Sequence, residues 1–366
     1  LFGVNEPSYI MVMGLIIFLD SISSIPMLGY RAENKPNIFI LFSMLNAGIN
    51  MIFNFIFILI LKMNIEGVFF GNLVASVLLF ILVLPFIIKR FDIDHLSKDR
   101  WSTIISFAIP FLPAGLFAML MEVADRYILK LLTNLQTVGI YSAGYKVGVL
   151  MLLLANAFNM GWQPYFLEKK INFFSGDLYS RINTIVLSVL GFVWLGLLFF
   201  ADDLIRFEFF GFSFFGTEFL DSLTIIPWIS LGYFFYGFYL LQTPGMFLKN
   251  LPSYAAWTRL IGAITNIGLC FFLIPIYGAL GAAYATCISF MVMAFSMYFI
   301  NIRLIPVRLE MKKIILIIFF LLVGFISFHI FNDRLEINIV IMFFYLLCMI
   351  YFRIINVENI NKIIRN

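Results

Sequence analysis

Charged residues, histidine and cysteine are all scarce in this sequence. Charged residues make up 12% of the 366 positions and histidine occurs twice, whereas 63% of the positions are hydrophobic. Soluble domains are about 45–50% apolar and about 25% charged. Because a soluble fold cannot bury so much apolar surface, the composition excludes a water-soluble enzyme, a disordered chain, a disulfide scaffold and a nucleic-acid-binding protein.

The cysteines and histidines offer no reactive or metal-binding pattern. Cys270, Cys287 and Cys348 lie inside apolar runs without CxxC spacing, so we expect them to pack between helices as small apolar groups. His95 and His329 have no partner at metal-ligand spacing. The sequence has no P-loop, nucleophile elbow or dinucleotide-binding motif. It therefore predicts no catalytic residue, no metal site and no cofactor.

Long apolar runs dominate the chain instead. A membrane-spanning helix needs about 20 mostly apolar residues, and eleven segments meet this requirement. They are expected at 8–29, 37–61, 65–88, 103–124, 137–166, 182–201, 222–247, 253–275, 278–300, 312–331 and 337–352. The predicted fold class is an all-α, polytopic membrane helix bundle.

The basic residues are distributed unevenly over the connections between these spans. One alternate set of connections carries eighteen of the 24 lysines and arginines, Arg31 and Arg259 among them, and the other set carries five. Basic residues favour the cytoplasmic side, so this asymmetry predicts a cytoplasmic C-terminus and an outer Leu1. Since the chain would begin outside without a signal peptide, we expect that it is a fragment from which an odd number of spans is missing.

A short internal repeat indicates how many spans are missing. Ile65–Val68 opens the third span and resembles Ile276–Ala279, which opens the ninth. In a parallel repeat, these two spans would each end a six-helix lobe, so three spans of the first lobe are missing and the complete protein has about fourteen. The predicted domains are the remainder of an N-terminal lobe at 1–88, a cytoplasmic inter-lobe loop at 89–102, a C-terminal six-helix lobe at 103–300, and an appended helix pair with a tail at 301–366.

Lys146 is the clearest polar residue inside a span. It lies about nine residues into the fifth span, hence about 14 Å deep. At about 100° per residue, Ser142, Asn156, Asn159 and Gln163 share its side of the helix. A charge at this depth costs about 2.5–3.5 kcal/mol on insertion scales. Two hypotheses explain it: a water-filled cavity that attracts an anion, or an ion pair with a carboxylate that locks two helices.

Asparagines form a second polar face, on the second span. Asn46, Asn50 and Asn54 are spaced at i, i+4 and i+8, so they line one side of a helix. Such a ladder fits contacts to a polar substrate, and it fits amide hydrogen bonds between helices equally well.

Acidic residues in the spans are candidates for ion coupling. Asp20 lies deep in the first span with Ser24 one turn on. Its carboxylate would carry a proton or bind Na⁺, or would simply bond to neighbouring hydroxyls. Glu122, Asp125 and Arg126 end the fourth span. Glu122 and Arg126 are four residues apart and can form an ion pair, which is the structural alternative for this group.

Seven short segments stand in an order and spacing that carry a family resemblance. They are Arg31–Lys35, Ile109–Pro113, Ala124–Leu129, Val138–Ser142, Ala143–Lys146, Trp162–Tyr165 and Gly278–Ala283. Together they resemble bacterial polysaccharide-exporting, O-antigen type flippases of the multidrug/oligosaccharidyl-lipid/polysaccharide exporter superfamily. The dense part of the resemblance runs over about 105–168, and no single motif is diagnostic.

The resemblance implies two lobes around a central cationic cavity with alternating access. The implied substrate is an undecaprenyl-pyrophosphate-linked oligosaccharide, flipped across the inner membrane for O-antigen, lipopolysaccharide or capsule synthesis. The other implied partners are the bilayer, an H⁺ or Na⁺ coupling ion and the polysaccharide assembly machinery. The candidate substrate-binding residues are Lys146, Asn46, Asn50, Asn54, Asn156, Arg31 and Arg126, and the candidate ion-coupling residues are Asp20, Glu122 and Asp125.

Two other functions stay open on the sequence. A cation-coupled multidrug exporter of the same fold usually has acidic residues in its cavity, whereas the charge at mid-span here is basic. A membrane polysaccharide polymerase needs a sizeable outer loop, and the longest outer connection here has about 20 residues. The sequence therefore favours a flippase, and not an enzyme.

Overall fold

The computed structural model describes residues 7–33, 35–90, 98–169, 177–206, 208–209, 212–213, 217–306, 308–331, 334–352 and 354. The chain divides into two compact units, Leu1–Trp101 (unit 1) and Ser102–Asn366 (unit 2). Within the described residues, ten helical segments are long and apolar enough to cross a membrane, and a shorter apolar helix lies at Leu335–Tyr351. The prediction of an all-helical membrane bundle is confirmed: the chain is a multi-pass membrane protein.

Unit 1 is built from long helices that pack on one central member. They are α1 (Pro7–Ala32), α2 (Pro36–Phe55) with a π-helical turn η1 (Ile56–Ile60) at its end, and α3 (Asn64–Arg90). Both α1 and α2 pack on α3. Met27, Leu79 and Val83 form a small buried cluster between α1 and α3.

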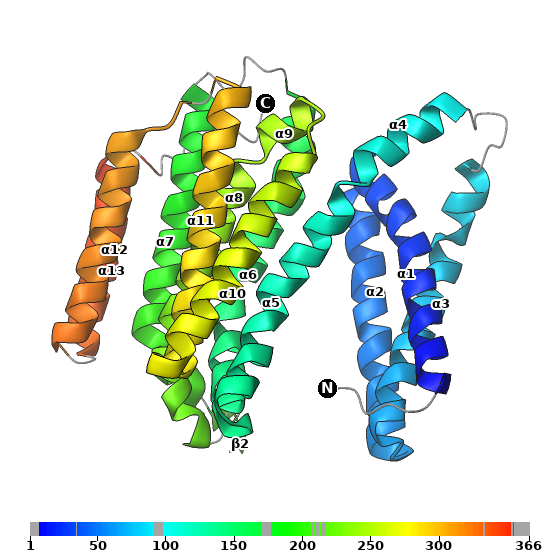
Figure 1. Ribbon diagram of the computed structural model, residues 1–366, viewed down its shortest axis with the longest axis horizontal. Coiled ribbons are helices and arrows are strands. Elements are labelled where there is room, and N and C mark those ends of the chain that lie inside the picture. The colour runs from blue at the N-terminus through cyan, green and yellow to red at the C-terminus, as the bar shows by residue number, and fades with distance from the viewer. Residues whose placement is uncertain are drawn as a thin grey trace. The chain divides into compact units, whose positions relative to one another are not determined.

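Unit 2 contains the other helices, which Figure 1 shows from cyan to orange. They are α4 (Lys98–Ala108), which crosses the boundary between the units in sequence, α5 (Phe111–Leu132), α6 (Leu135–Leu167), α7 (Asp177–Arg206), α8 (Ile226–Leu241), α9 (Pro244–Leu248), α10 (Ser253–Tyr277), α11 (Ala279–Leu304), α12 (Met311–Phe331) and α13 (Leu335–Tyr351).

These helices pack in a fixed order of neighbours. α6 packs on α8, α8 on α11, α11 on α10, and α10 on α5, while α12 and α13 pack against α7 (Figure 1). The end of unit 2 at which α5, α7 and α10 begin is called the basic end below, because Lys169, Lys249 and Arg303 lie there. Between α7 and α8, two-residue strands β1 (Glu208–Phe209) and β2 (Phe212–Ser213) pair antiparallel and are followed by a 3-10 segment η3 (Thr217–Thr224).

Proline divides two of the predicted spans. The span expected at 103–124 is split between α4 and α5 at Pro110, and the span expected at 222–247 is split between α8 and α9 just before Pro244. Proline has no N–H to donate and its ring clashes with the preceding turn, so a helix tends to end before it. Pro26, Pro85 and Pro275 nevertheless lie inside continuous helices.

Two further expectations about connections are corrected by the structure. α3 continues to Arg90 and α4 begins at Lys98, so both ends of the predicted loop 89–102 are helical, and residues 91–97 lie outside the described residues. Lys89 and Arg90 in the last turn of α3 favour this extension because they complement the carbonyl end of the helix. Arg259, counted above among the connections, lies in the second turn of α10.

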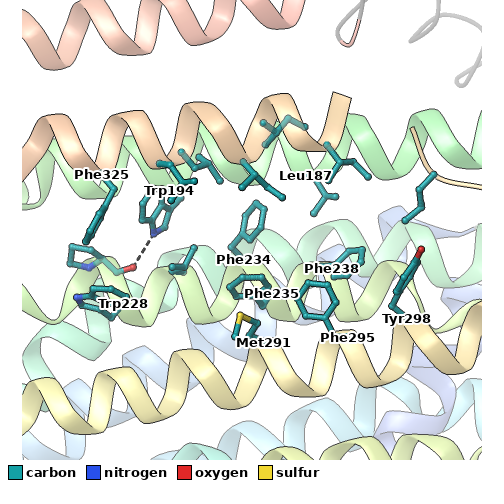
Figure 2. Close-up of a pocket in the computed structure, with 18 of the residues that line it drawn as sticks. Leu187, Trp194, Trp228, Phe234, Phe235, Phe238, Met291, Phe295, Tyr298 and Phe325 are labelled. Carbon is teal, nitrogen blue, oxygen red and sulfur yellow. Dashed lines mark hydrogen bonds between the residues drawn. The ribbon is translucent and has the colours of Figure 1, made fainter. Parts of the chain in front are cut away.

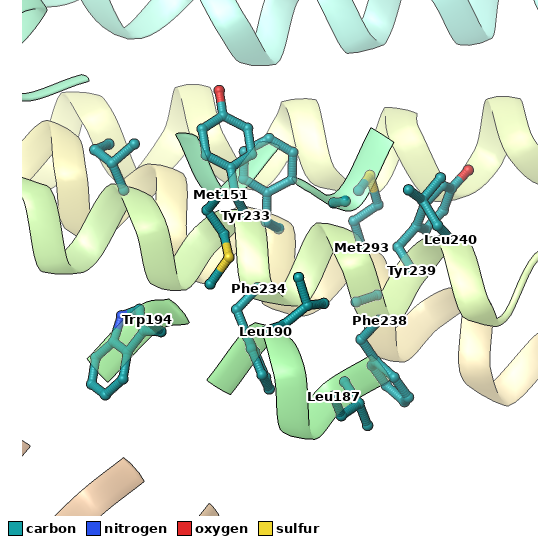
Figure 3. Close-up of a cluster of buried hydrophobic side chains, with 14 of the residues drawn as sticks. Met151, Leu187, Leu190, Trp194, Tyr233, Phe234, Phe238, Tyr239, Leu240 and Met293 are labelled. Carbon is teal, nitrogen blue, oxygen red and sulfur yellow. The ribbon is translucent and has the colours of Figure 1, made fainter. Parts of the chain in front are cut away.

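The helix α8 separates an apolar interior from a face that carries hydroxyl groups. In Figure 3, Phe234 lies beside Leu190 and Phe238 beside Leu187, both of α7, whereas Tyr233 and Tyr239 point to the other side of α8. All of these side chains are buried, Tyr233 and Tyr239 with only 1% of their surface exposed. The tyrosine face is therefore also part of the core, on the side of α8 where Tyr233 meets Tyr145 of α6 and Phe290 of α11.

A buried amide network ties together the helices near the basic end. Gln242, which follows α8, donates to Asn183 of α7 at 2.8 Å and accepts from Asn301 of α11 at 3.2 Å. The Asn301 Oδ1 also accepts the main-chain N–H of Gly245 in α9 at 2.9 Å. Asn183, Gln242 and Asn301 are each 0% exposed. The network thus satisfies backbone and side-chain groups at the break between α8 and α9.

We expect the substitution Asn301→Ala to destabilise unit 2. It leaves the buried N–H of Gly245 and the Oε1 of Gln242 without a partner, and each such loss costs about 1–3 kcal/mol. The melting temperature should fall by about 4 °C or more. It can be followed with a thiol-reactive dye, since Cys270 and Cys287 are buried.

The control for this substitution is Ser296→Ala. The Ser296 hydroxyl donates only within its own helix, to the carbonyl of Val292, at 2.7 Å. Its loss should leave the melting temperature nearly unchanged. Equal melting temperatures for Asn301→Ala and the unchanged chain would contradict a structural role of the network.

Candidate functional site

A buried carboxylate lies where several helices of unit 2 meet. Asp125 of α5 is 0% exposed. Its Oδ2 accepts hydrogen bonds from the hydroxyls of Tyr141 (α6) at 2.5 Å and Thr286 (α11) at 3.4 Å, and its Oδ1 accepts the main-chain N–H of Arg126 at 2.6 Å. Asn266 of α10 donates to the Thr286 hydroxyl at 3.4 Å. Four helices thus contribute to one polar cluster around Asp125.

Hydrogen-bond donors and the charge of the adjacent Arg126, but no ion pair, balance the charge of Asp125 in the part of the chain that the structure describes. No basic side chain there lies within ion-pair distance of this carboxylate. A carboxylate inside a membrane protein is costly unless it is paired, and a proton or a small cation would neutralise it. Among the described residues no group of three or more His, Cys, Asp or Glu could hold a metal ion, so the cluster fits a proton or a monovalent cation better than a divalent metal.

Arg126, the residue after Asp125, is held against an aromatic ring. Its guanidinium carbon lies 4.1 Å from the centre of the Tyr145 ring, and its Nη1 donates to the main-chain carbonyl of Glu122 at 2.6 Å. The Tyr145 hydroxyl is in turn 2.5 Å from the Tyr233 hydroxyl of α8. Arg126 therefore binds the main-chain carbonyl of Glu122 and not its carboxylate, which is exposed. The ion pair that the i, i+4 spacing of these two described residues allowed is not formed.

Lys146 lies next to Tyr145 and points out of unit 2. It follows the start of α6 at Leu135 by eleven residues, hence about 17 Å along the helix. Lys146 and Asn156 are both exposed, and they belong to the face of α6 that unit 2 leaves uncovered. Within the described part of unit 2, Lys146 has no carboxylate at ion-pair distance. A helix-locking partner for Lys146 is therefore not found there.

In unit 1, the asparagine ladder of α2 faces α3. Asn50 donates to Asn72 of α3, and Asn54 donates to Asn50 at 2.7 Å. The side chain of Asn54 contacts Gly71 so closely that any Cβ at Gly71 would collide with it. The Oδ1 of Asn46 is buried and has no hydrogen-bond partner among the described residues. Asn50 thus bonds to α3 and Asn54 bonds within α2, while the Oδ1 atoms of Asn46 and Asn54 have no hydrogen-bond partner among the described residues.

The other candidates in unit 1 are less constrained. Asp20 is exposed on α1. The hydroxyls of Ser21 and Ser24 donate to the main-chain carbonyls of Ile17 and Ser21, at 2.6 Å and 2.7 Å, so these neighbours do not bond to the Asp20 carboxylate. The side chain of Arg31 lies outside the described residues.

Sequence reasoning missed the partners that complete this site. Tyr141, Tyr145, Asn266 and Thr286 surround Asp125 and Arg126, and none of them was assigned to a site. Asn266 and Thr286 are polar groups inside apolar spans, which is a usable signal by itself. The i, i+4 spacing of Tyr141 and Tyr145 places both tyrosines on one face of α6. The spacing does not show which helices contact that face, because this depends on tertiary packing.

A separate apolar cavity of 460 Å³ lies between α7, α8, α11 and α12. Figure 2 shows Phe234, Phe235, Phe238 and Phe295 around it, with Phe325 of α12 at one side. The described residues that line it include no charged side chain. An apolar chain would fit this cavity, whereas a charged headgroup finds no partner in it.

The chain is similar to a family of polysaccharide biosynthesis proteins. Residues 4–170 match the family model described as "Polysaccharide biosynthesis protein". No curated protein matches the chain at a significant level. The resemblance inferred from the sequence is confirmed by the family match and by the similar structures described next.

Solved structures of transporters share the fold. A lipid II flippase MurJ in an inward closed conformation has a TM-score of 0.61 and 20% identity, over 92% of this chain and 72% of that chain. An outward-facing multidrug resistance MATE family transporter of the MOP superfamily has a TM-score of 0.66 and 14% identity, over 81% of this chain and 68% of that chain. A MOP superfamily transporter from Pyrococcus furiosus has a TM-score of 0.64 and 14% identity, with the same shares covered. At such low identity the likeness shows the exporter fold alone.

Proposed function

We propose that the protein is a flippase that moves undecaprenyl-pyrophosphate-linked oligosaccharide across the bacterial inner membrane for surface polysaccharide synthesis, as O-antigen or capsule. The observation that carries the proposal is Arg126, a half-buried guanidinium in a membrane helix that rests on the Tyr145 ring. No carboxylate pairs with it in the described part of the chain. A cation in hydrocarbon is costly unless it meets an anion, and arginine binds phosphates through two parallel hydrogen bonds.

Lys146 and Asn156 extend this polar surface along α6. The exposed ammonium of Lys146 would attract the pyrophosphate near the middle of the membrane, and the exposed amide of Asn156 would contact sugar hydroxyls. Asn46 and Asn54, whose Oδ1 atoms have no hydrogen-bond partner among the described residues, are the members of the asparagine ladder that would accept a hydrogen bond from a sugar hydroxyl. In this proposal Arg31 contributes a further positive charge, and the polyprenyl tail stays in an apolar environment.

Asp125 is the proposed site of the coupling ion. Its carboxylate is buried among hydroxyl and amide groups from three other helices, so it can hold a proton or Na⁺ out of contact with water. Glu122 and Asp20 are exposed carboxylates, which would titrate with solvent and are weaker candidates. Because Asp125 and Arg126 are adjacent, ion binding at the first would alter the field at the second.

The proposal also assigns the larger organisation. Residues 1–88 would be the remainder of the N-terminal lobe and 103–300 the C-terminal lobe, with 301–366 appended and the C-terminus in the cytoplasm. The lobes would expose the substrate surface to each side of the membrane in turn, and the polysaccharide assembly machinery would receive the product. The protein would act as a transporter, not as an enzyme.

Deleting the gene in its host tests the function. We expect surface polysaccharide to disappear and lipid-linked repeat units to accumulate in the membrane, measured by lipid extraction and mass spectrometry. A deletion strain with normal polysaccharide and increased sensitivity to dyes or drugs would contradict the flippase and support the multidrug exporter.

Complementation with Arg126→Ala tests the observation behind the proposal. We expect polysaccharide export to fall about tenfold or more, because a lost charge-assisted hydrogen bond to a phosphate is worth about 1.5–3 kcal/mol. Lys130→Ala is the matched control, since Lys130 is an exposed cation one turn further along α5. Equal export by both variants at equal protein levels would remove Arg126 from the substrate site.

A further inference from the structure

A second arginine inside unit 2, Arg259, lies near the basic end. It follows the start of α10 at Ser253 by six residues, hence about 9 Å along the helix. Its side chain is half-buried, and its Nη1 donates to the main-chain carbonyl of Ala114 in α5 at 3.3 Å. The guanidinium carbon lies 5.9 Å from the centre of the Tyr239 ring of α8. Arg259 is therefore held between α5 and α8.

Most of the hydrogen-bonding capacity of Arg259 is unused. A guanidinium has five N–H donors, and the carbonyl of Ala114 takes one of them. Among the residues that the structure describes, no carboxylate lies within ion-pair distance of Arg259. Its charge is thus available to an anion.

The hydroxyl of Tyr239 is a second, independent sign of a missing ligand. Tyr239 is 1% exposed, yet its Oη is buried without a hydrogen-bond partner among the described residues. A buried hydroxyl without a partner is unfavourable and needs an explanation, and a bound ligand that accepts its hydrogen bond is one. Figure 3 shows Tyr239 pointing away from the apolar side of α8, on which Phe234 and Phe238 lie. A donor hydroxyl and a free guanidinium therefore occupy one location.

Arg259 and Tyr239 form the same kind of pair as Arg126 and Tyr145, at a different depth in unit 2. In both places an arginine lies over the ring of a tyrosine from another helix, Tyr145 for Arg126 and Tyr239 for Arg259. Arg126 lies six residues before the end of α5, hence about 9 Å from it. It lies twelve residues beyond Ala114, the contact of Arg259, hence about 18 Å along α5. The two arginine–tyrosine pairs thus lie at different depths in unit 2, and the pair of Arg259 is the one nearer the basic end.

We propose that Arg259 and Tyr239 form an anion-binding station at the basic end, which takes the pyrophosphate of the substrate before Arg126 does. This inference rests on the proposed function. The phosphate oxygens would accept hydrogen bonds from the Arg259 guanidinium and from the Tyr239 hydroxyl. Two stations about 18 Å apart divide the passage of a doubly charged group into shorter moves, in each of which a cation is near.

Binding of a short analogue to the purified full chain in lipid nanodiscs tests the station. Farnesyl pyrophosphate is the probe and farnesol the uncharged control, both followed by isothermal titration. We expect the unchanged chain to bind two molecules of farnesyl pyrophosphate, and Arg259→Met to bind one, with farnesol binding unchanged. Arg303→Met is the matched control, since Arg303 is an exposed arginine at the same end of unit 2.

The substitution Tyr239→Phe separates ligand binding from folding. Because the Tyr239 hydroxyl has no partner in the described fold, its loss should leave the melting temperature unchanged or raise it. Affinity at the station should still fall about threefold to tenfold. Tyr277→Phe, at an exposed tyrosine in the last position of α10, should change neither quantity.

The outcomes distinguish this station from the function on which it rests. If the unchanged chain does not prefer farnesyl pyrophosphate to farnesol, the flippase proposal and the station are both overturned. If it does prefer the pyrophosphate, and Arg126→Met weakens binding while Arg259→Met and Tyr239→Phe do not, the station alone is overturned.

Discussion

Replacing Lys146 by alanine is expected to abolish surface polysaccharide while leaving the protein inserted in the membrane at a normal level. Lys146 is exposed on α6, so its removal should disturb the packing of unit 2 little. It is, however, a cation about 17 Å along a membrane helix, where a pyrophosphate has the least solvent to screen its charge. Export is measured as surface polysaccharide per cell in a strain that carries only the variant.

The companion substitutions make this result specific to charge. Lys146→Arg should keep part of the export, because the charge is retained although its shape changes. Lys249→Ala removes an exposed lysine at the basic end and should leave export normal. Normal export by Lys146→Ala, with protein confirmed in the membrane, would exclude Lys146 from the mechanism.

Replacing Asp125 by asparagine is expected to uncouple transport from its driving ion. The amide oxygen can still accept hydrogen bonds from Tyr141 and Thr286, whereas the main-chain N–H of Arg126 loses its acceptor, so we expect the fold to be retained with a lower stability. The charge that attracts a proton or Na⁺ is lost, and we expect uptake driven by an ion gradient in proteoliposomes to fall at least about tenfold. Binding of farnesyl pyrophosphate to the purified chain should change far less.

Two other substitutions test whether the effect of Asp125→Asn is specific to this carboxylate. Thr286→Val keeps the carboxylate but removes one hydroxyl of its shell, so an intermediate loss of transport is expected. Asp203→Asn removes an exposed carboxylate at the end of α7 and should have no effect. A full transport rate with unchanged ion dependence in Asp125→Asn would show that the coupling ion binds elsewhere.

The bilayer explains why so much of the fold follows from sequence alone. A spanning segment has to satisfy its own backbone hydrogen bonds, so long apolar runs can only be helices. The eleven runs accordingly correspond to helical segments. What the runs do not specify is where a helix breaks. Pro275 is tolerated inside α10, whereas α8 ends before Pro244, where the Asn301 amide accepts the N–H of Gly245 from another helix.

The candidate site was predicted in part, for a related reason. Helical spacing places Lys146 and Asn156 on one face, and the structure leaves that face uncovered in unit 2. The same spacing does not reveal that Tyr141 and Thr286 meet at Asp125, because they come from helices whose order of packing is a tertiary property. Arg259 was missed because it was counted as a marker of topology, although it lies within α10.

The groups that surround Asp125, here called its shell, are synthesised at very different times. Thr286 follows Asp125 by 161 residues, and Asn266 follows it by nearly as many. At about 5–20 residues per second, a ribosome reaches Thr286 about 8–30 s after Asp125 has been polymerised. For most of this interval the main-chain N–H of Arg126 and the hydroxyl of Tyr141, sixteen residues away, are the only members of the shell that have been synthesised. The shell is complete only when α11, which carries Thr286, has packed against α5.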